Sequence, residues 1–369
     1  MLEEGRSEEE LFSFLSLKKG EDSSYHHVLS SMCTIPHPVA ARAHQMFLEA
    51  NLGDPGLFRG TAEIEALLIE RIGDLLHHRR AGGYATSGGT ESNLQALRIF
   101  RKMKASSRPN IVVPESAHFS FEKACDILSL GMRTVPCDDS FRMDADALQE
   151  AIDADTCAVV AIAGTTEYGV VDPIAAIADI AHDTGVPLHV DAAFGGFVIP
   201  FLKQEIPFDF SLEGVSSIAI DPHKMGMSTI PCGSLLVREP SWFDLLNVET
   251  PYLTVKQECT LAGTRSGGAV VGAFAVLEYL GKSGLAAIVR GCMKNTKRLI
   301  TGMETLGYRR AVTPDLNVAT FHADHVPPGW RVSWTRRGHM RTVMMPHVHL
   351  SVIEEFLRDI GDNNAQKTD

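Results

Sequence analysis

The chain has 369 residues, enough for two or three domains and for a sizeable hydrophobic core. Its formal net charge of −12 argues against nucleic acid or an anionic membrane as the main partner, while a local basic pocket stays possible. The seven cysteines are odd in number and include no CxxC pair, which favours reduced thiols over a disulfide framework. The N-terminus is acidic rather than signal-like, and no apolar run approaches membrane-spanning length. We therefore expect a cytoplasmic protein.

Residues 1–55 are predicted to form an N-terminal arm. Residues 8–19 have the pattern of a short amphipathic helix, and Pro36 and Pro38 then interrupt regular structure. An arm of this size cannot build its own core, so it should pack on another domain or on a partner subunit. A longer helix from about 60 to 78 opens the next domain, with one face formed by Ile64, Leu67, Leu68, Ile72 and Leu75.

Residues 56–282 alternate strand and helix patterns. Asp172 and Pro173 predict a helix start, as N-cap and first helical residue. Alternating buried strands and amphipathic helices predict an α/β domain with a mostly parallel sheet covered on both faces. The expected strands are 111–114, 158–163, 188–190, 217–220 and 234–237.

Residues 283–369 are predicted to form a smaller α+β domain. Its expected elements are strands at 318–322, 330–335 and 341–345 and a helix at 351–360. The polar residues 361–369 are expected to be a disordered tail.

Lys224 follows a strand and an Asp-Pro turn, in the segment DPHKMG at 221–226. Open α/β sheets bind their ligands at the carboxyl ends of strands, and burial there would favour a neutral, nucleophilic amine. Asp191 ends another expected strand, in HVDAAFGG at 189–196. An amine and a carboxylate at neighbouring strand ends suit pyridoxal phosphate, because one binds its aldehyde and the other keeps its ring nitrogen protonated.

The glycine-rich segment GGYATSGGTESN at 82–93 opens a helix. Its glycines allow close backbone approach, and the free N–H groups of the helix start, with Ser87 and Thr90, suit a phosphate monoester. An ordinary capped helix is about as good an interpretation of this motif alone. The segment is neither a Walker loop nor a dinucleotide fingerprint, which disfavours nucleoside triphosphates and nicotinamide cofactors.

Other polar residues follow strands and are weaker candidates. His118 could stack on a planar cofactor ring, although a single histidine is more often a packing residue. Thr165 and Thr166 would face the same crevice, or form a polar turn without a ligand.

A metal site is the rival interpretation from a different class of protein. His189, Asp191 and His223 match the ligand types of a non-haem iron facial triad. That interpretation leaves Lys224 and the glycine-rich segment unexplained, so no metal is predicted.

Four segments together resemble the group II pyridoxal-phosphate-dependent amino-acid decarboxylases. They are TSGGTESN at 86–93, SAHFS at 116–120, HVDAA at 189–193 and DPHK at 221–224. The resemblance covers roughly residues 50–280 and implies a fold-type I, aminotransferase-like architecture and a homodimer with active sites at the subunit interface. One departure is Asp221, where many relatives have asparagine.

The resemblance also implies residue roles. Lys224 would hold the cofactor covalently, and Asp191 would pair with its ring nitrogen. His118 would stack on one face of the ring and Ala193 would support the other. Gly89, Thr90 and His223 would bind the phosphate, with Thr165 or Thr166 near the cofactor's edge.

Two further roles and the activity follow from the same resemblance. Arg341 is the candidate for binding the substrate carboxylate, and Tyr252 is the nearest counterpart of a mobile-loop tyrosine that protonates the product. TLAGTRSG at 260–267 resembles a segment that relatives extend towards the neighbouring subunit. The segment EYGVVD at 167–172 is most similar to archaeal members, which implies conversion of L-tyrosine to tyramine and/or L-aspartate to β-alanine, for methanofuran and coenzyme A. Glutamate decarboxylation, a sphingosine-phosphate-lyase-like reaction and amino transfer stay open.

Overall fold

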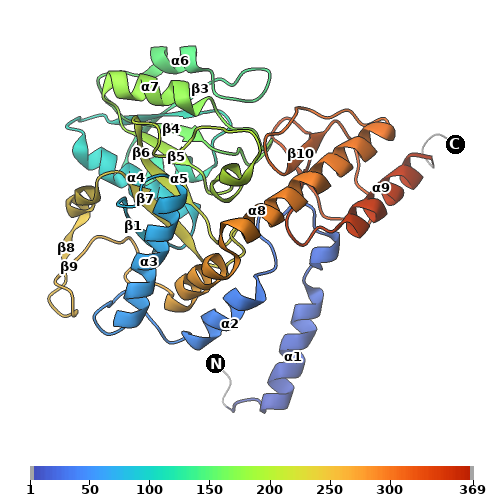
Figure 1. The fold of residues 1–369 in the computed structure, drawn as a ribbon, viewed down its shortest axis with the longest axis horizontal. Coiled ribbons are helices and arrows are strands. Elements are labelled where there is room, and N and C mark those ends of the chain that lie inside the picture. The colour runs from blue at the N-terminus through green and yellow to red at the C-terminus, as the bar shows by residue number, and fades with distance from the viewer. Residues whose placement is uncertain (1–3, 366–369) are drawn as a thin grey trace.

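Seven strands form the central sheet of the computed structural model, which describes residues 4–365 (Figure 1). Strands β2 to β6 pair in parallel, while β7 runs antiparallel to both β1 and β6. The predicted α/β class with a mostly parallel sheet is therefore confirmed. The order is β1-β7-β6-β5-β4-β2-β3, with β1 at Gly82–Thr86, β2 at Asn110–Pro114, β3 at Gly131–Val135, β4 at Thr156–Ile162, β5 at Leu188–Asp191, β6 at Val215–Ile220 and β7 at Gly233–Val237.

Helices cover both faces of this sheet, because successive strand residues point to opposite sides. Ile111 and Val113 of β2 pack with α4 (Gly89–Met103) and α5 (Ser120–Leu128). Val112, between them, belongs to the core on the other face. That face is covered by α3 (Arg59–Leu75), α6 (Ala145–Ala151), α7 (Ile174–Thr184) and the first part of α8 (Gly267–Thr305).

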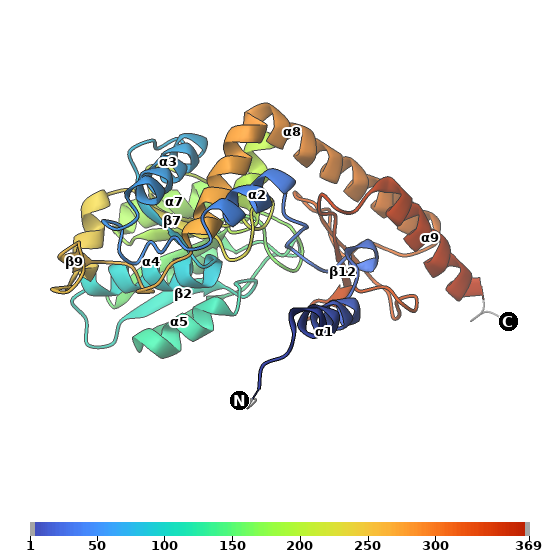
Figure 2. The ribbon, with the colours of Figure 1, turned by 90° about the horizontal axis from the view of Figure 1, so that it is seen from below.

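Helix α8 links the large sheet to the smaller C-terminal unit (Figure 2). It bends at Gly281, whose φ of 56° and ψ of −175° are not helical, next to the domain boundary expected at residue 282. Its start packs closely on α2 (Pro38–Met46), since a Cβ at Gly272 would lie 2.9 Å from the Ala40 carbonyl oxygen. Contrary to the sequence analysis, α8 is long and apolar enough to cross a membrane, a test that core helices of soluble proteins also pass.

The smaller unit is built from β10 (Val318–Phe321), β11 (Ser333–Trp334), β12 (Met340–Val343), α9 (Leu350–Ala365) and the second part of α8. Its strands are antiparallel in the order β10-β12-β11, and Phe321, Trp330 and Phe356 belong to its core. The expected disordered tail is wrong for residues 361–365, which continue α9; residues 366–369 lie outside the described residues.

The N-terminal arm has two different parts. Helix α1 (Glu8–Glu21) has no buried residue and stands apart from the rest of the chain (Figures 1 and 2). Leu29 and Leu52, further along, are buried in the cores of the smaller and larger units. The remaining short elements are η1 (Tyr25–His27), η2 (Gly195–Phe197), η3 (Ile199–Phe201), η4 (Pro240–Leu246), β8 (Val248–Glu249) and β9 (Gln257–Glu258).

Asp172 differs from its expected role as a helix cap. Helix α7 begins at Ile174 without a side-chain cap. The Asp172 carboxylate instead accepts hydrogen bonds from the backbone N–H groups of Ile162 at 2.7 Å and Met143 at 2.9 Å. Its role is to join the end of β4 to a loop distant in the sequence.

Candidate active site

A cavity of about 290 Å³ lies at the carboxyl ends of five strands, β1, β2, β4, β5 and β6. This is where open α/β sheets bind ligands. Nine predicted site residues line it: Ser87, Gly89, Thr90, His118, Thr166, Asp191, Ala193, His223 and Lys224. The other lining residues are Gly88, Asn93, Ser116, Ile162, Gly164, Phe194 and Asp221.

Lys224 lies in the turn that follows β6, with its side chain 21% exposed. Its Nζ is 3.3 Å from Oδ2 of the buried Asp221. Lys224, the lysine in the cavity lining, therefore forms an ion pair with a buried carboxylate rather than standing alone at the strand end.

Glycines at the start of α4 form a backbone surface suited to an anion. Gly88 is the N-cap, and its φ of 149° strongly favours glycine. A Cβ at Gly88 would lie 3.1 Å from His223 Cε1, and one at Gly89 would lie 3.0 Å from the Ala193 Cβ. The helix start is fixed by Glu91, whose Oε2 accepts the Ser87 N–H at 2.8 Å. Free N–H groups and the helix dipole together favour a phosphate here.

Asp191 ends β5 and is held by two donors. Asn93 Nδ2 donates to its Oδ2 at 2.9 Å, and the Ala193 N–H donates to its Oδ1 at 3.1 Å. The residue is buried, and the two bonds fix the orientation of its carboxylate at the cavity wall. An anion held in this way can accept a hydrogen bond from a protonated ring nitrogen.

His189 is fully buried behind Asp191, and both of its ring nitrogens are used. Since Asn93 Nδ2 donates elsewhere, Asn93 Oδ1 must accept from His189 Nε2 at 2.9 Å, which leaves Nδ1 to accept from Ser217 Oγ at 2.8 Å. Burial lowers the pKa of His189 to about 4. Among residues 4–365, His189, Asp191 and His223 do not converge at ligand spacing, so the iron-site interpretation is wrong.

His223 and His118 each have one ring nitrogen, Nδ1, bonded to a backbone N–H group. His223 Nδ1 accepts from the Cys232 N–H at 3.2 Å, and His118 Nδ1 accepts from the Ser120 N–H at 3.2 Å. In each neutral ring the proton therefore lies on Nε2, which makes that atom a donor. Burial is the largest influence on both and lowers the pKa of each.

Thr165 and Arg341 lie outside the cavity wall. Thr165 is fully buried, and its hydroxyl accepts from the Val170 N–H at 3.3 Å, whereas Thr166 lines the cavity. Arg341, on β12, donates to the carbonyl oxygens of Thr166 and Ser30 and to Ser333 Oγ. Its Nη2 is buried without a partner in the described residues, and burial lowers the pKa of its guanidinium to about 10.

Two other predicted segments lie away from the cavity. Tyr252 is 85% exposed in the loop between β8 and β9 and does not line the cavity of its own chain. Arg265, in the 260–267 segment, points into its own chain and forms an ion pair with Glu65 of α3. Neither reaches Lys224 within one protomer.

Asn93 and Asp221 are the residues whose roles the sequence analysis did not assign. Asn93 belongs to the glycine-rich segment, one helical turn after Gly89, and that spacing places it on the same face of α4. Asp221 immediately follows β6, three residues before Lys224. The position of both relative to strand ends could have indicated them, but their partners are far away in the sequence.

The cavity fits pyridoxal phosphate. The two glycines provide a surface that a Cβ would fill, the Asp191 carboxylate is fixed at one wall, and Lys224 lies in reach of the same space. This combination of a mostly parallel sheet, a strand-end lysine and a glycine-rich helix start defines a fold-type I pyridoxal-phosphate enzyme.

Comparison with known proteins gives the family. Residues 60–315 match the pyridoxal-dependent decarboxylase conserved domain. The chain belongs to this family and is a pyridoxal-phosphate-dependent amino-acid decarboxylase. It is 66% identical to a probable L-tyrosine/L-aspartate decarboxylase of Methanoculleus marisnigri, over 99% of this chain and 100% of that protein.

Two other relatives extend the comparison. A probable L-aspartate decarboxylase of Archaeoglobus fulgidus is 48% identical over 92% of this chain and 95% of its own length. Among solved structures, the sphingosine-1-phosphate lyase of Burkholderia pseudomallei K96243 matches with a TM-score of 0.90 and 27% identity, covering 98% of this chain and 91% of that one. The fold is therefore shared by decarboxylases and a carbon–carbon lyase.

Proposed function

We propose that this chain decarboxylates L-tyrosine to tyramine and/or L-aspartate to β-alanine. The observation that carries the proposal is near-complete coverage at 66% identity to a relative with that name. A 48% identical relative is named for aspartate alone, so aspartate is common to both. Tyramine would serve methanofuran formation and β-alanine coenzyme A formation, as the archaeal resemblance implies.

The cavity residues divide the work as follows. When bound, pyridoxal phosphate supplies an electron sink for the pair left at Cα as CO2 departs. The start of α4 and His223 Nε2 would hold the phosphate, and the Asp191 carboxylate would keep the ring nitrogen protonated. His118 and Ala193 would bind the two faces of the ring. Lys224 would hold the cofactor covalently until the substrate amine replaces it, and Lys224 or the loop residue Tyr252 would deliver a proton at the substrate Cα.

Arg341 is the proposed partner of the substrate α-carboxylate. Its unpartnered Nη2 is a buried donor on a guanidinium already bonded to the Thr166 carbonyl, and Thr166 itself lines the cavity. A carboxylate would satisfy that donor. The substrate side chain would meet Ile162 and Phe194 if it is a tyrosine ring, or the polar wall if it is an aspartate carboxylate.

We also propose that the protein is a cytoplasmic homodimer. Helix α1 exposes Leu11, Phe12, Phe14, Leu15 and Leu17, apolar side chains spread around the helix rather than on one face, which a second copy would cover. In a dimer, the exposed Tyr252 loop could approach the partner's cavity. All seven cysteines are free thiols, which fits a reducing compartment. Light scattering of the full chain should give twice 40.2 kDa; a monomer at micromolar concentration would contradict the dimer.

The test of the function is a visible absorption spectrum followed by a substrate panel. The purified protein should show the band of lysine-bound cofactor, borohydride should remove it, and Lys224→Ala should lack it. CO2 release is then measured with L-tyrosine, L-aspartate and L-glutamate. Release from glutamate alone would overturn the proposed substrates, and a protein that pyridoxal phosphate cannot reconstitute would overturn the cofactor.

A carbon–carbon lyase is the second candidate, because a sphingosine-1-phosphate lyase shares the fold at 27% identity. It would use the same cavity residues on a phosphorylated amino alcohol. Cleavage of that substrate without CO2 release from any amino acid would favour it. Keto-acid production would instead indicate amino transfer.

A further inference from the structure

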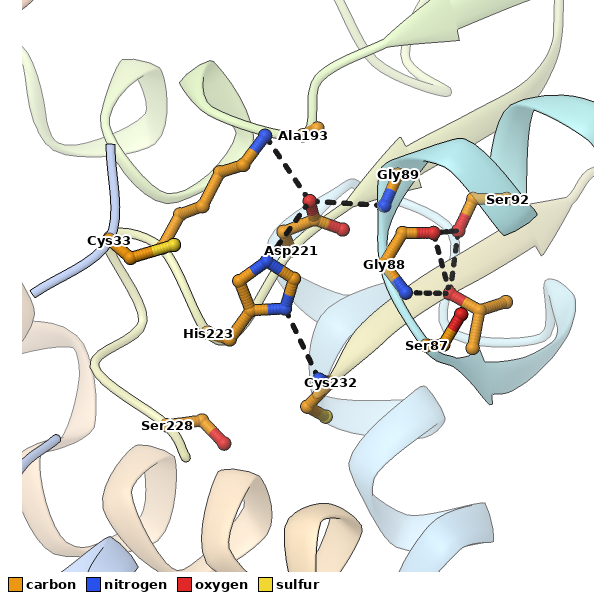
Figure 3. Close-up of polar contacts among 12 residues, drawn as sticks. Cys33, Ser87, Gly88, Gly89, Ser92, Ala193, Asp221, His223, Ser228 and Cys232 are labelled. Atoms are coloured by element: carbon orange, nitrogen blue, oxygen red, sulfur yellow. Dashed lines mark hydrogen bonds and ion pairs between the residues drawn. The ribbon is translucent and has the colours of Figure 1, made fainter. Parts of the chain in front are cut away.

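Asp221 is a buried carboxylate at the place where the site must hold a phosphate. Its Oδ2 accepts the Gly89 N–H at 3.1 Å and lies 3.6 Å from His223 Nε2 (Figure 3). The same oxygen lies 3.3 Å from Lys224 Nζ. Its Oδ1 is buried and has no hydrogen-bond partner among the described residues. One oxygen therefore receives all the donors, while the other is uncompensated.

The donors that meet Asp221 are those that a phosphate needs. Gly89 is the first residue of α4, where free N–H groups and the helix dipole favour an anion. His223 Nε2 is the donor atom of its neutral ring, because Nδ1 accepts from Cys232. A phosphate bound here would share these donors with a carboxylate of the same charge sign, and like charges repel more strongly when one of them, as Asp221 is, is buried.

The ion pair between Lys224 and Asp221 is a second interaction that cofactor binding would disturb. Its ammonium is the only full positive charge within 4 Å of the carboxylate among the ion pairs of residues 4–365. If Lys224 held the cofactor covalently, its nitrogen would no longer be a free ammonium, so the pairing that compensates the buried Asp221 carboxylate would change. Cofactor binding thus disturbs two of the interactions that stabilise Asp221.

We infer that Asp221 is an internal anion of the phosphate site: it pairs with Gly89 and Lys224, competes with the cofactor's phosphate, and so weakens cofactor binding. Asp221 thus positions Gly89 and Lys224 and lowers the affinity for the cofactor, which makes the cofactor easier to exchange. The inference rests on the cofactor of the proposed function and is independent of the substrate.

The test compares Asp221→Asn with the unaltered full chain, each depleted of cofactor and titrated with pyridoxal 5′-phosphate. Asparagine keeps an oxygen for the Gly89 N–H and removes the charge. We expect Kd to fall by about tenfold or more, the effect of removing one like charge at close range. For pyridoxal, which lacks the phosphate, the same substitution should lower Kd by no more than about threefold. The phosphate-specific gain should persist in a Lys224→Ala background, which separates it from the Lys224 ion pair.

Asp209→Asn is the matched control. Asp209 is also a buried aspartate that accepts a backbone N–H, from Ser211, and meets a histidine, His77, but it lies outside the cavity. Its Kd for the cofactor should be unchanged. Stabilisation of each cofactor-free protein by inorganic phosphate provides a second readout, and it should be larger for Asp221→Asn.

The outcomes separate this inference from the proposed function. Unchanged or weaker binding by Asp221→Asn, or an equal gain with pyridoxal, would overturn the inference while leaving the decarboxylase intact. Failure of the unaltered chain to bind the cofactor would overturn the proposed function as well. If Asp221→Asn does not fold, Asp221→Ser, which is also neutral, is titrated and judged by the same criteria.

Discussion

Asn93 Nδ2 donates to Asp191 Oδ2 over 2.9 Å, so a residue near the start of α4 orients the carboxylate at the end of β5. The carbonyl oxygen of the same carboxamide accepts from His189. The two strand residues are therefore fixed relative to the helix whose first residues form the anion site. A cofactor held at its phosphate by α4 would meet a carboxylate positioned by that same helix.

Asp191→Ala should retain cofactor and lose decarboxylation. Without the carboxylate the ring nitrogen is not kept protonated and the electron sink weakens, so kcat should fall by about 100-fold or more. Cofactor content by absorbance and CO2 release measure the two effects separately. Asp209→Ala, which changes a buried aspartate outside the cavity, is the control. Equal loss of cofactor and activity would make Asp191 a structural residue.

Asn93→Ala should lower both stability and kcat. It leaves His189 Nε2 without its buried acceptor, which costs about 1–3 kcal/mol in the free energy of unfolding. It also lets Asp191 reorient, so kcat should fall about tenfold with little change in KM. Gln95→Ala removes another buried amide of α4, which donates to Cys259, and should reduce stability alone. A stability loss without a kcat loss in Asn93→Ala would contradict the positioning role.

His189 should make the protein less stable in acid. Burial lowers its folded pKa from 6.5 to about 4, so between these values the unfolded chain binds a proton that the folded chain does not. The stabilising contribution is full above pH 6.5 and is lost as pH falls towards 4, a change of roughly 3 kcal/mol. Urea unfolding at pH 7.5 and pH 5 should show a smaller difference for His189→Gln. The exposed His182→Gln serves as control, and an unchanged pH dependence in His189→Gln would be the contrary result.

Strand-end residues were predictable from the sequence because strand periodicity is local. Lys224, Asp191 and His118 each follow an expected strand, and all three line the cavity. Strand β1 was missed because Gly82 and Gly83 resemble a turn. The structure explains Gly83 by contact, since a Cβ there would lie 2.6 Å from the Leu235 carbonyl oxygen of β7.

Side-chain roles that depend on residues far away in the sequence were not predictable. Thr165 and Thr166 are adjacent in a turn, and only the packed chain shows that Thr166 faces the cavity. Asp172 fits a helix cap locally, but its carboxylate bonds to Met143, 29 residues away. Asp221 likewise meets Gly89 across 132 residues. Sequence patterns located the strand ends, while side-chain direction required the tertiary structure.

Arg341→Lys tests recognition of the substrate carboxylate. Lysine keeps a positive charge but lacks the planar guanidinium. In Arg341 that group bonds Thr166, Ser30 and Ser333 and has Nη2 left to bind a carboxylate. We expect KM for the amino acid to rise at least about tenfold, with cofactor affinity unchanged, because a charged bidentate contact contributes about 1.5–3 kcal/mol. Arg336→Lys is the control, since Arg336 also donates to backbone carbonyls but is exposed, and the residues that accept, Glu115 and Ala117, do not line the cavity as Thr166 does. A lower melting temperature with an unchanged KM in Arg341→Lys would show that Arg341 only ties β12 to the strand-end loop.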